Sequence, residues 1–84
     1  MIKKLIINAD DFGMCEGNSL GILLAHEQGI VSSTTVMMNM PYASWALDKA
    51  KAYPNLGIGV HLTLTAGKPL LSGKKSYTDE AGNF

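Results

Sequence analysis

Apolar and polar residues follow one another in blocks along this chain, and the blocks predict alternating strands and helices. A short apolar run at residues 5–7 predicts a first strand, buried on both faces, that stops at Asn8. Residues 18–28 carry leucines at the i, i+3 and i+4 spacing of an amphipathic helix. Asn18 or Ser19 would cap the start of this helix.

The second half of the chain repeats the pattern and then loses it. Residues 32–39 are rich in β-branched and then apolar side chains, which predicts a second strand. Pro41 opens a second predicted helix, which ends before Pro54, and residues 56–63 predict a third strand. Residues 65–84 hold glycines, a proline and polar residues without periodicity, so we expect an irregular segment there.

The predicted order is therefore βαβαβ, which is typical of an α/β fold. Strands joined through helices form a parallel sheet with right-handed crossovers. Ligands of such folds bind at the carboxyl ends of the strands. That edge of the sheet is where the chemistry of this chain is expected.

Polar side chains stand after each predicted strand. Asp10 and Asp11 lie in the predicted loop after the first strand. The second strand ends at Asn39, and the third ends near His61 and Thr63. Because the carboxyl ends of parallel strands share one edge, we expect these side chains to converge.

A carboxylate and an imidazole at neighbouring strand ends can hold a divalent metal ion. The adjacent aspartates would then divide two roles, with one on the metal and the other taking a proton from water. Two ligands are too few for a tight site. The other histidine, His26, falls in the predicted first helix, and the irregular segment offers only Asp79 and Glu80.

Simpler interpretations of the same residues stay open. The stretch Asp-Asp-Phe-Gly at 10–13 is also compatible with a polar turn. His61, between Val60 and Leu62, is also compatible with a histidine of the core.

Composition narrows the class of protein. The chain has 84 residues, of which 46% are hydrophobic, enough for one small domain with a packed core. Seven basic and seven acidic residues give no charge excess that would favour nucleic acid. A single cysteine, Cys15, fits a reducing compartment. With no apolar run long enough for a membrane span, a cytoplasmic protein is expected.

Three motifs resemble one known family. The chain reads NADDFGM near its start, GIVSSTTVMMNMP after the first predicted helix, and GIGVHLTLTAGKPL at the third predicted strand. In this order and spacing they resemble the YdjC-like carbohydrate deacetylases, and the trailing YTDEAGNF is also similar to that family. The resemblance extends over essentially the whole chain.

The resemblance implies a fold and an activity. The fold would be a deformed TIM-like (β/α) barrel of the polysaccharide-deacetylase type, which takes about 250 residues when complete. Residues 1–84 would be the amino-terminal part of this single catalytic domain. The activity would be hydrolysis of N-acetyl groups on amino sugars or oligosaccharides. The piece alone would be inactive.

The resemblance also implies roles for particular residues. Asp11 and His61 would bind a divalent metal ion, Mg²⁺ or Zn²⁺, and Asp10 would be the general base. The third ligand in the family is a histidine further along the chain. The general acid and the substrate-binding residues have no candidate in this sequence.

Two rival hypotheses come from other classes of protein. A response-regulator receiver domain also carries an acidic pair after its first strand and binds Mg²⁺, but it needs an aspartate where His61 stands. A non-catalytic sugar-binding fragment is the other hypothesis.

The expected partner of the protein is a small N-acetylated sugar or oligosaccharide. No nucleic acid and no membrane are expected as partners, and a homo-oligomer is a possibility that the sequence leaves open.

Overall fold

Strands and helices alternate along the chain in the predicted βαβαβ order. The computed structural model describes residues 3–71 and 76–84. The elements are β1 (Asn8–Phe12), α1 (Glu16–Gln28), β2 (Ser33–Val36), α2 (Ala43–Ala50) and β3 (Gly57–Val60). All three strands are parallel, which confirms the predicted fold class.

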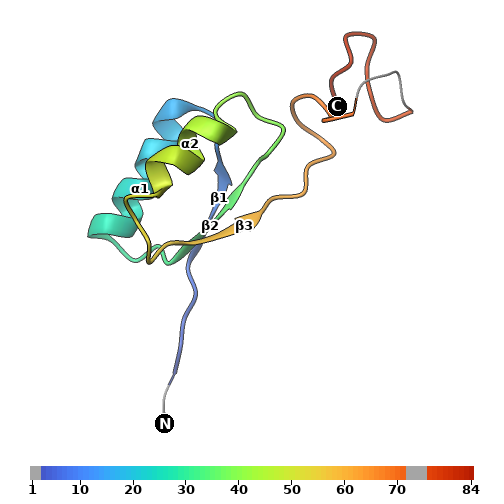
Figure 1. The fold of residues 1–84 in the computed structure, drawn as a ribbon. Helices are drawn as coiled ribbons and strands as arrows, with labels where there is room; N and C mark the ends of the chain where they lie inside the picture. Colours follow the sequence, from blue (N-terminus) through green and yellow to red (C-terminus); the bar gives the residue numbers. More distant parts are fainter. Residues whose placement is uncertain (1–2, 72–75) are drawn as a thin grey trace.

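The strands lie in the sheet in the order β1-β2-β3, and both helices stand on the same side of it (Figure 1). Flavodoxin-like folds, which include receiver domains, instead have the order 2-1-3. The receiver hypothesis is therefore wrong for this chain. Strands that follow one another in sequence order are the arrangement found in (β/α) barrels.

The core lies between the helices and the sheet face that they cover. Its buried members are Phe12, Ile22, Leu23, Val36, Ala43, Ala46, Ala50 and Leu56. Three of its members are alanines of α2, and Phe12 at the end of β1 is fully buried in the same core. A buried aromatic ring of this size contributes about 2–3 kcal/mol of stability relative to an exposed one.

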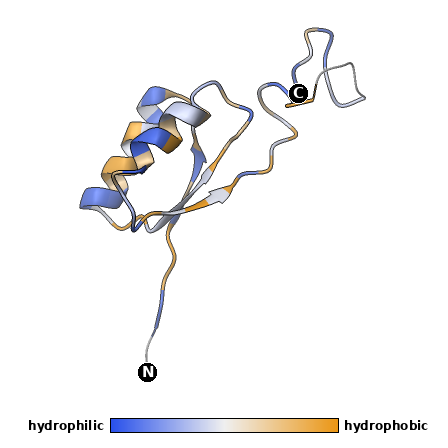
Figure 2. Cartoon of the chain, in the orientation of Figure 1, coloured by the Kyte–Doolittle hydropathy of each residue, from blue (hydrophilic) through white to orange (hydrophobic). Residues whose placement is uncertain are grey.

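The first strand differs from the prediction. It covers Asn8–Phe12, not the apolar run at residues 5–7, where Leu5 and Ile6 are 80% and 76% exposed. The apolar run leads away from the sheet (Figure 2). A strand buried on both faces was expected, but the helices cover only one face. Alternation of polar and apolar residues, as in Asn8-Ala9-Asp10, was therefore the correct strand pattern.

The other boundaries also shift. Helix α1 begins two residues earlier than expected, and its cap is Cys15, whose Sγ accepts a hydrogen bond from the Asn18 amide at 3.4 Å. Neither Asn18 nor Ser19 is the cap. Helix α2 begins after the turn at Pro41, and β2 and β3 are four residues each, shorter than predicted.

The segment after β3 is irregular. Residues 61–71 and 76–84 contain no helix or strand, and residues 72–75 of the predicted irregular segment lie outside the described residues. Asn39 donates from Nδ2 to the Ala66 carbonyl at 2.8 Å and ties this segment to the end of β2. Among the described residues, no helix has the length and apolar character needed to cross a membrane.

Candidate active site

A β-bulge in β1 gives the two adjacent aspartates their orientation. Ala9 pairs with Thr34 and Phe12 pairs with Val36, so β1 advances three residues where β2 advances two. Asp11 lies within this irregularity and has a φ of 70°, a left-handed conformation that is uncommon outside glycine. Bulges of this kind re-aim a side chain next to many active sites.

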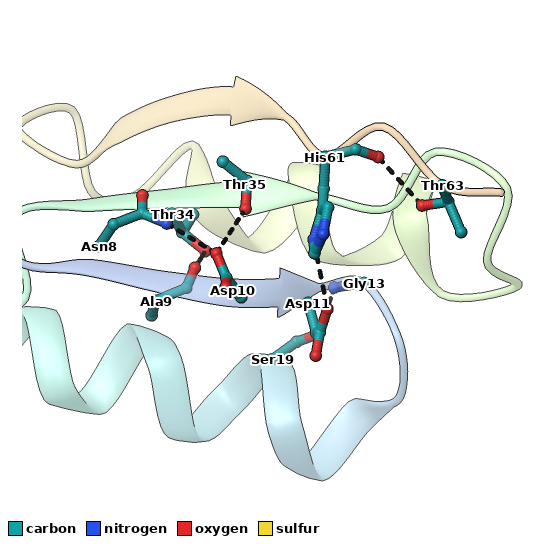
Figure 3. A network of polar contacts seen from close by, with 10 residues as sticks. All are labelled: Asn8, Ala9, Asp10, Asp11, Gly13, Ser19, Thr34, Thr35, His61 and Thr63. Atoms are coloured by element: carbon teal, nitrogen blue, oxygen red, sulfur yellow. Dashed lines mark hydrogen bonds and ion pairs between the residues drawn. The ribbon is translucent and has the colours of Figure 1, made fainter. Parts of the chain in front are cut away.

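The bulge brings Asp11 to His61. The Asp11 Oδ1 and His61 Nδ1 atoms are 3.2 Å apart, although Asp11 lies in β1 and His61 directly follows β3, 50 positions later in the sequence. Figure 3 shows the His61 ring extending from the end of β3 across β2 toward β1. The structure therefore brings together two of the side chains that the sequence placed at this edge.

The His61 ring nitrogen has an unusual environment. Nδ1 is buried, and no described residue is oriented to hydrogen-bond with it, even though the Asp11 oxygen is within ion-pair distance. Two atoms that bind one metal ion at about 2.0–2.2 Å lie about 3.0–3.4 Å apart. The observed separation and the oxygen–nitrogen donor set therefore fit a divalent cation.

A buried hydrogen bond supports the turn that follows Asp11. The Gly13 amide donates to the Ser19 Oγ at 2.9 Å, and the Ser19 side chain is completely buried at the start of α1. Gly13 has a φ of +90°, and a Cβ added there would lie only 2.9 Å from the Ala43 Cα. Only glycine fits this position, so the turn is fixed by contacts from both helices.

Asp10 is held separately from Asp11. Its Oδ1 accepts a hydrogen bond from the Asn8 Nδ2 at 2.9 Å and another from the Thr35 Oγ1 at 3.3 Å (Figure 3). Sequence reasoning missed Asn8, Thr35 and the buried Ser19. Asn8 and Thr35 could have been found from the two-residue period of a strand. Asn8 and Asp10 are two residues apart and therefore share a face, and Thr35 lies on the adjacent strand.

Other predicted polar residues occupy the edge without joining the pair. Thr63 donates from Oγ1 to the His61 carbonyl at 3.1 Å, which shapes the chain just beyond β3. Asn39 bonds to Ala66, as described above, and does not contact the aspartates. The His26 ring lies on α1 and contacts the Val31 carbonyl through Nδ1 at 2.7 Å, so it is not part of the site.

A complete set of metal ligands is not present within residues 3–71 and 76–84. No three side chains of His, Cys, Asp or Glu in this part of the chain lie close enough to hold one ion. Asp79 and Glu80, the candidates in the irregular segment, therefore do not complete the site with Asp11 and His61 there. Cys15 is exposed and serves as the cap of α1.

A mostly apolar cavity of about 260 Å³ lies beside His61. Its lining includes the polar residues Asn39 and Thr63, and Tyr77 and Phe84 of the irregular segment. These two rings contact each other at 5.8 Å between centroids. The carboxyl edge of the sheet thus combines a polar pair with an adjoining space large enough for a small ligand.

Comparison with known proteins decides the family. The model of the family described as YdjC-like protein matches residues 4–84. The chain belongs to the YdjC-like family. This confirms the resemblance noted in the three sequence motifs.

Curated relatives in the YdjC-like family carry the name carbohydrate deacetylase. One from Thermoanaerobacter pseudethanolicus is 49% identical over 99% of this chain and 34% of its own length. Another, from Vibrio cholerae serotype O1, is 51% identical over 96% of this chain and 32% of its own length. The chain therefore spans about a third of the length of the curated relatives that it matches.

A solved structure has the same fold. The crystal structure of a protein from Enterococcus faecalis V583, provisionally described as a cellobiose-phosphate cleavage protein, matches with a TM-score of 0.93 and 49% identity. The match covers 98% of this chain and 33% of that chain. The βαβαβ unit is thus the arrangement found in a longer YdjC-like protein.

Proposed function

We propose that the complete protein carrying this chain is a metal-dependent carbohydrate deacetylase. It would hydrolyse N-acetyl groups of amino sugars or oligosaccharides. The observation that carries the proposal is the 3.2 Å approach of Asp11 Oδ1 to the unpartnered His61 Nδ1, at the sheet edge where ligands of parallel α/β folds bind. Relatives named carbohydrate deacetylase support the reaction class.

Asp11 and His61 are the proposed metal ligands. Oxygen and nitrogen donors suit Zn²⁺, whereas Mg²⁺ would require more oxygen ligands and waters. A divalent cation bound here would supply Lewis-acid chemistry to the amide carbonyl and to the attacking water. Because two protein ligands make a weak site, we expect residues 1–84 expressed alone to show no deacetylase activity.

Asp10 is the proposed general base. Its carboxylate takes a proton from water as the water oxygen bonds to the acetyl carbon. The bond from that carbon to the sugar nitrogen then breaks as a general acid, for which this sequence has no candidate, protonates the nitrogen, and the products are acetate and a free amine. The two aspartates can divide these roles because the bulge directs them to different partners, Asp11 to His61 and Asp10 to Thr35.

Three variants of the complete protein test these roles. Asp10→Asn should lower kcat by about 10²–10⁴-fold, the usual contribution of a general base, without loss of bound metal. Asp11→Asn and His61→Ala should both reduce metal content measured by elemental analysis. The matched control is Asp48→Asn, because Asp48 is exposed on α2 and its ion pair within the described residues is with Lys51.

Acetate release from N-acetylated sugars is the activity measurement. Full metal occupancy in both Asp11→Asn and His61→Ala would contradict the ligand assignment. Absence of acetate release by the wild-type complete protein, across a panel of N-acetylated amino sugars with Zn²⁺ or Mg²⁺ supplied, would contradict the proposed reaction.

A further inference from the structure

We propose that Asn8 is a positioning residue for Asp10, with its own side chain fixed by Ser33 and with Thr35 as a second donor to the same carboxylate. This inference rests on the proposed function, in which Asp10 is the base. The residues concerned lie on the sheet face that the helices do not cover.

The strand geometry places Asn8 beside Asp10. Residues two apart in a strand point to the same face, so both side chains of β1 stand on the open face of the sheet. The Asn8 Nδ2 donates to Asp10 Oδ1 at 2.9 Å, a length typical of a hydrogen bond to a charged acceptor.

The Asp10 carboxylate, which only accepts hydrogen bonds, selects the NH₂ end of the Asn8 amide, and Ser33 holds the other end. The Ser33 hydroxyl donates to the Asn8 Oδ1 at 2.7 Å, and Ser33 is the register partner of Asn8 in β2. With the amide oxygen occupied by this donor, the NH₂ group points to the carboxylate. The reversed amide would set two acceptor oxygens against each other, which is unfavourable.

Thr35 completes the arrangement from the neighbouring strand. Its Oγ1 donates to Asp10 Oδ1 at 3.3 Å, so both donors engage the same oxygen. Among the described residues, none donates to Asp10 Oδ2. The carboxylate therefore presents one fixed oxygen to the sheet and one open oxygen to the space above it.

This arrangement has a function for a general base. The terminal torsion of an aspartate is broad, so a carboxylate without such contacts rotates and exchanges its two oxygens. Donors from Asn8 and Thr35 oppose this rotation and hold Oδ2 in one orientation from which it can take a proton from water. Orientation of a reacting group contributes to the rate without changing how tightly substrate or metal is bound.

The test compares single variants in the complete, metal-loaded protein. Asn8→Ala should lower kcat by about tenfold, and Ser33→Ala and Thr35→Val by a few-fold each, since misplacement by even an ångström is costly. KM and metal content should not change. Thr35→Ser, which keeps the hydroxyl, should restore the wild-type kcat.

Matched controls come from residues without contact to Asp10. Asn55→Ala changes an exposed asparagine in the turn before β3, and Thr65→Val changes an exposed threonine beyond it. Both should keep the wild-type kcat. Thermal unfolding of every variant reports the folded fraction, so kcat is expressed per folded molecule.

The outcomes separate this inference from the proposed function. A wild-type protein that releases acetate, together with an Asn8→Ala variant of unchanged kcat, overturns the positioning role and leaves the deacetylase proposal standing. Equal loss in Thr35→Val and Thr35→Ser overturns the role of the Thr35 hydroxyl. A wild-type protein without deacetylase activity overturns the proposed function and this inference together.

Discussion

The two strand pairings of this sheet are built differently. Pairing between β2 and β3 is regular, with four successive register pairs from Ser33–Gly57 to Val36–Val60. Pairing between β1 and β2 is interrupted by the bulge between Ala9 and Phe12. In the regular pairing, β3 carries glycines, whereas in the interrupted pairing β1 carries polar side chains.

This difference separates two tasks. The regular pairing delivers His61 to a fixed place, because the His61 amide continues the ladder by donating to the Val36 carbonyl at 2.9 Å. The irregular pairing directs Asp11 toward it through a left-handed residue. Strain of about 1–3 kcal/mol is typical for such a residue, and it is concentrated where the chemistry is proposed.

The largest effect on stability is expected at the turn that ends the irregular pairing. Gly13→Ala combines a positive φ with a Cβ only 2.9 Å from the Ala43 Cα, and should lower the free energy of unfolding by about 3 kcal/mol or more. Chemical denaturation of the complete protein measures it.

Gly82→Ala separates the two causes. Gly82 has a similar φ of +84°, but no atom lies within 4 Å of an added Cβ. Gly82→Ala should therefore lower the free energy of unfolding by about 1 kcal/mol, which is the effect of the backbone conformation alone. Equal losses for the two variants would show that the close contact with α2 is not significant.

A smaller loss is expected from removal of the buried hydroxyl behind this turn. Ser19→Ala leaves the Gly13 amide buried without an acceptor, which should cost about 1–3 kcal/mol. Ser44→Ala, at an exposed position on α2, is the control and should change the unfolding free energy by less than about 0.5 kcal/mol. A Ser19→Ala loss no greater than the control would contradict this account.

The regular pairing should tolerate change. A Cβ added at Gly59 would lie 3.7 Å from the Thr35 Cγ2, an ordinary contact, so Gly59→Ala should raise the unfolding free energy by about 0.5–1 kcal/mol. Gly57→Ala, with its nearest contact at 3.5 Å, should behave alike. A clear destabilisation of either variant would show that this strand is as constrained as the bulged one.

The smallest effect concerns Tyr53, away from the aspartates. The negative charge of Glu27, burial, and the hydrogen bond to Glu27 raise the pKa of the phenol above its ordinary 10.0. A raised pKa means stabilisation that is complete below about pH 10 and lost as the pH rises through the folded-state pKa. Glu27→Gln should lower that pKa. Ultraviolet titration measures it, and comparison with Tyr53→Phe identifies the Tyr53 signal. An unchanged titration of Tyr53 in Glu27→Gln would contradict the assignment.

The sequence predicted the order of elements because Gly, Pro and apolar periodicity are local signals. It also predicted that Asp11 and His61 share an edge, because parallel topology alone requires this. The first strand was misplaced because residues 5–7 are more apolar than the strand itself. An apolar run does not reveal whether one face or both faces of a sheet are covered.

The bulge could not be predicted, because it depends on register between strands far apart in sequence. No local pattern distinguishes Asp11 in a left-handed conformation from Asp11 in a loop. The contacts of Ser33 with Asn8 and of Thr35 with Asp10 depend on the same inter-strand register. Each depends on a partner that only the folded sheet or turn defines.

The bulge also determines how this strand could evolve. Because β1 holds one residue more than its partner between two helix-facing positions, loss of a single codon there would restore regular alternation. Such a deletion would keep Ala9 and Phe12 facing the core and would remove a residue that faces His61. A descendant could therefore lose the site in one step and gain a less strained strand, so selection for activity, and not for folding, is what we expect to maintain the extra residue.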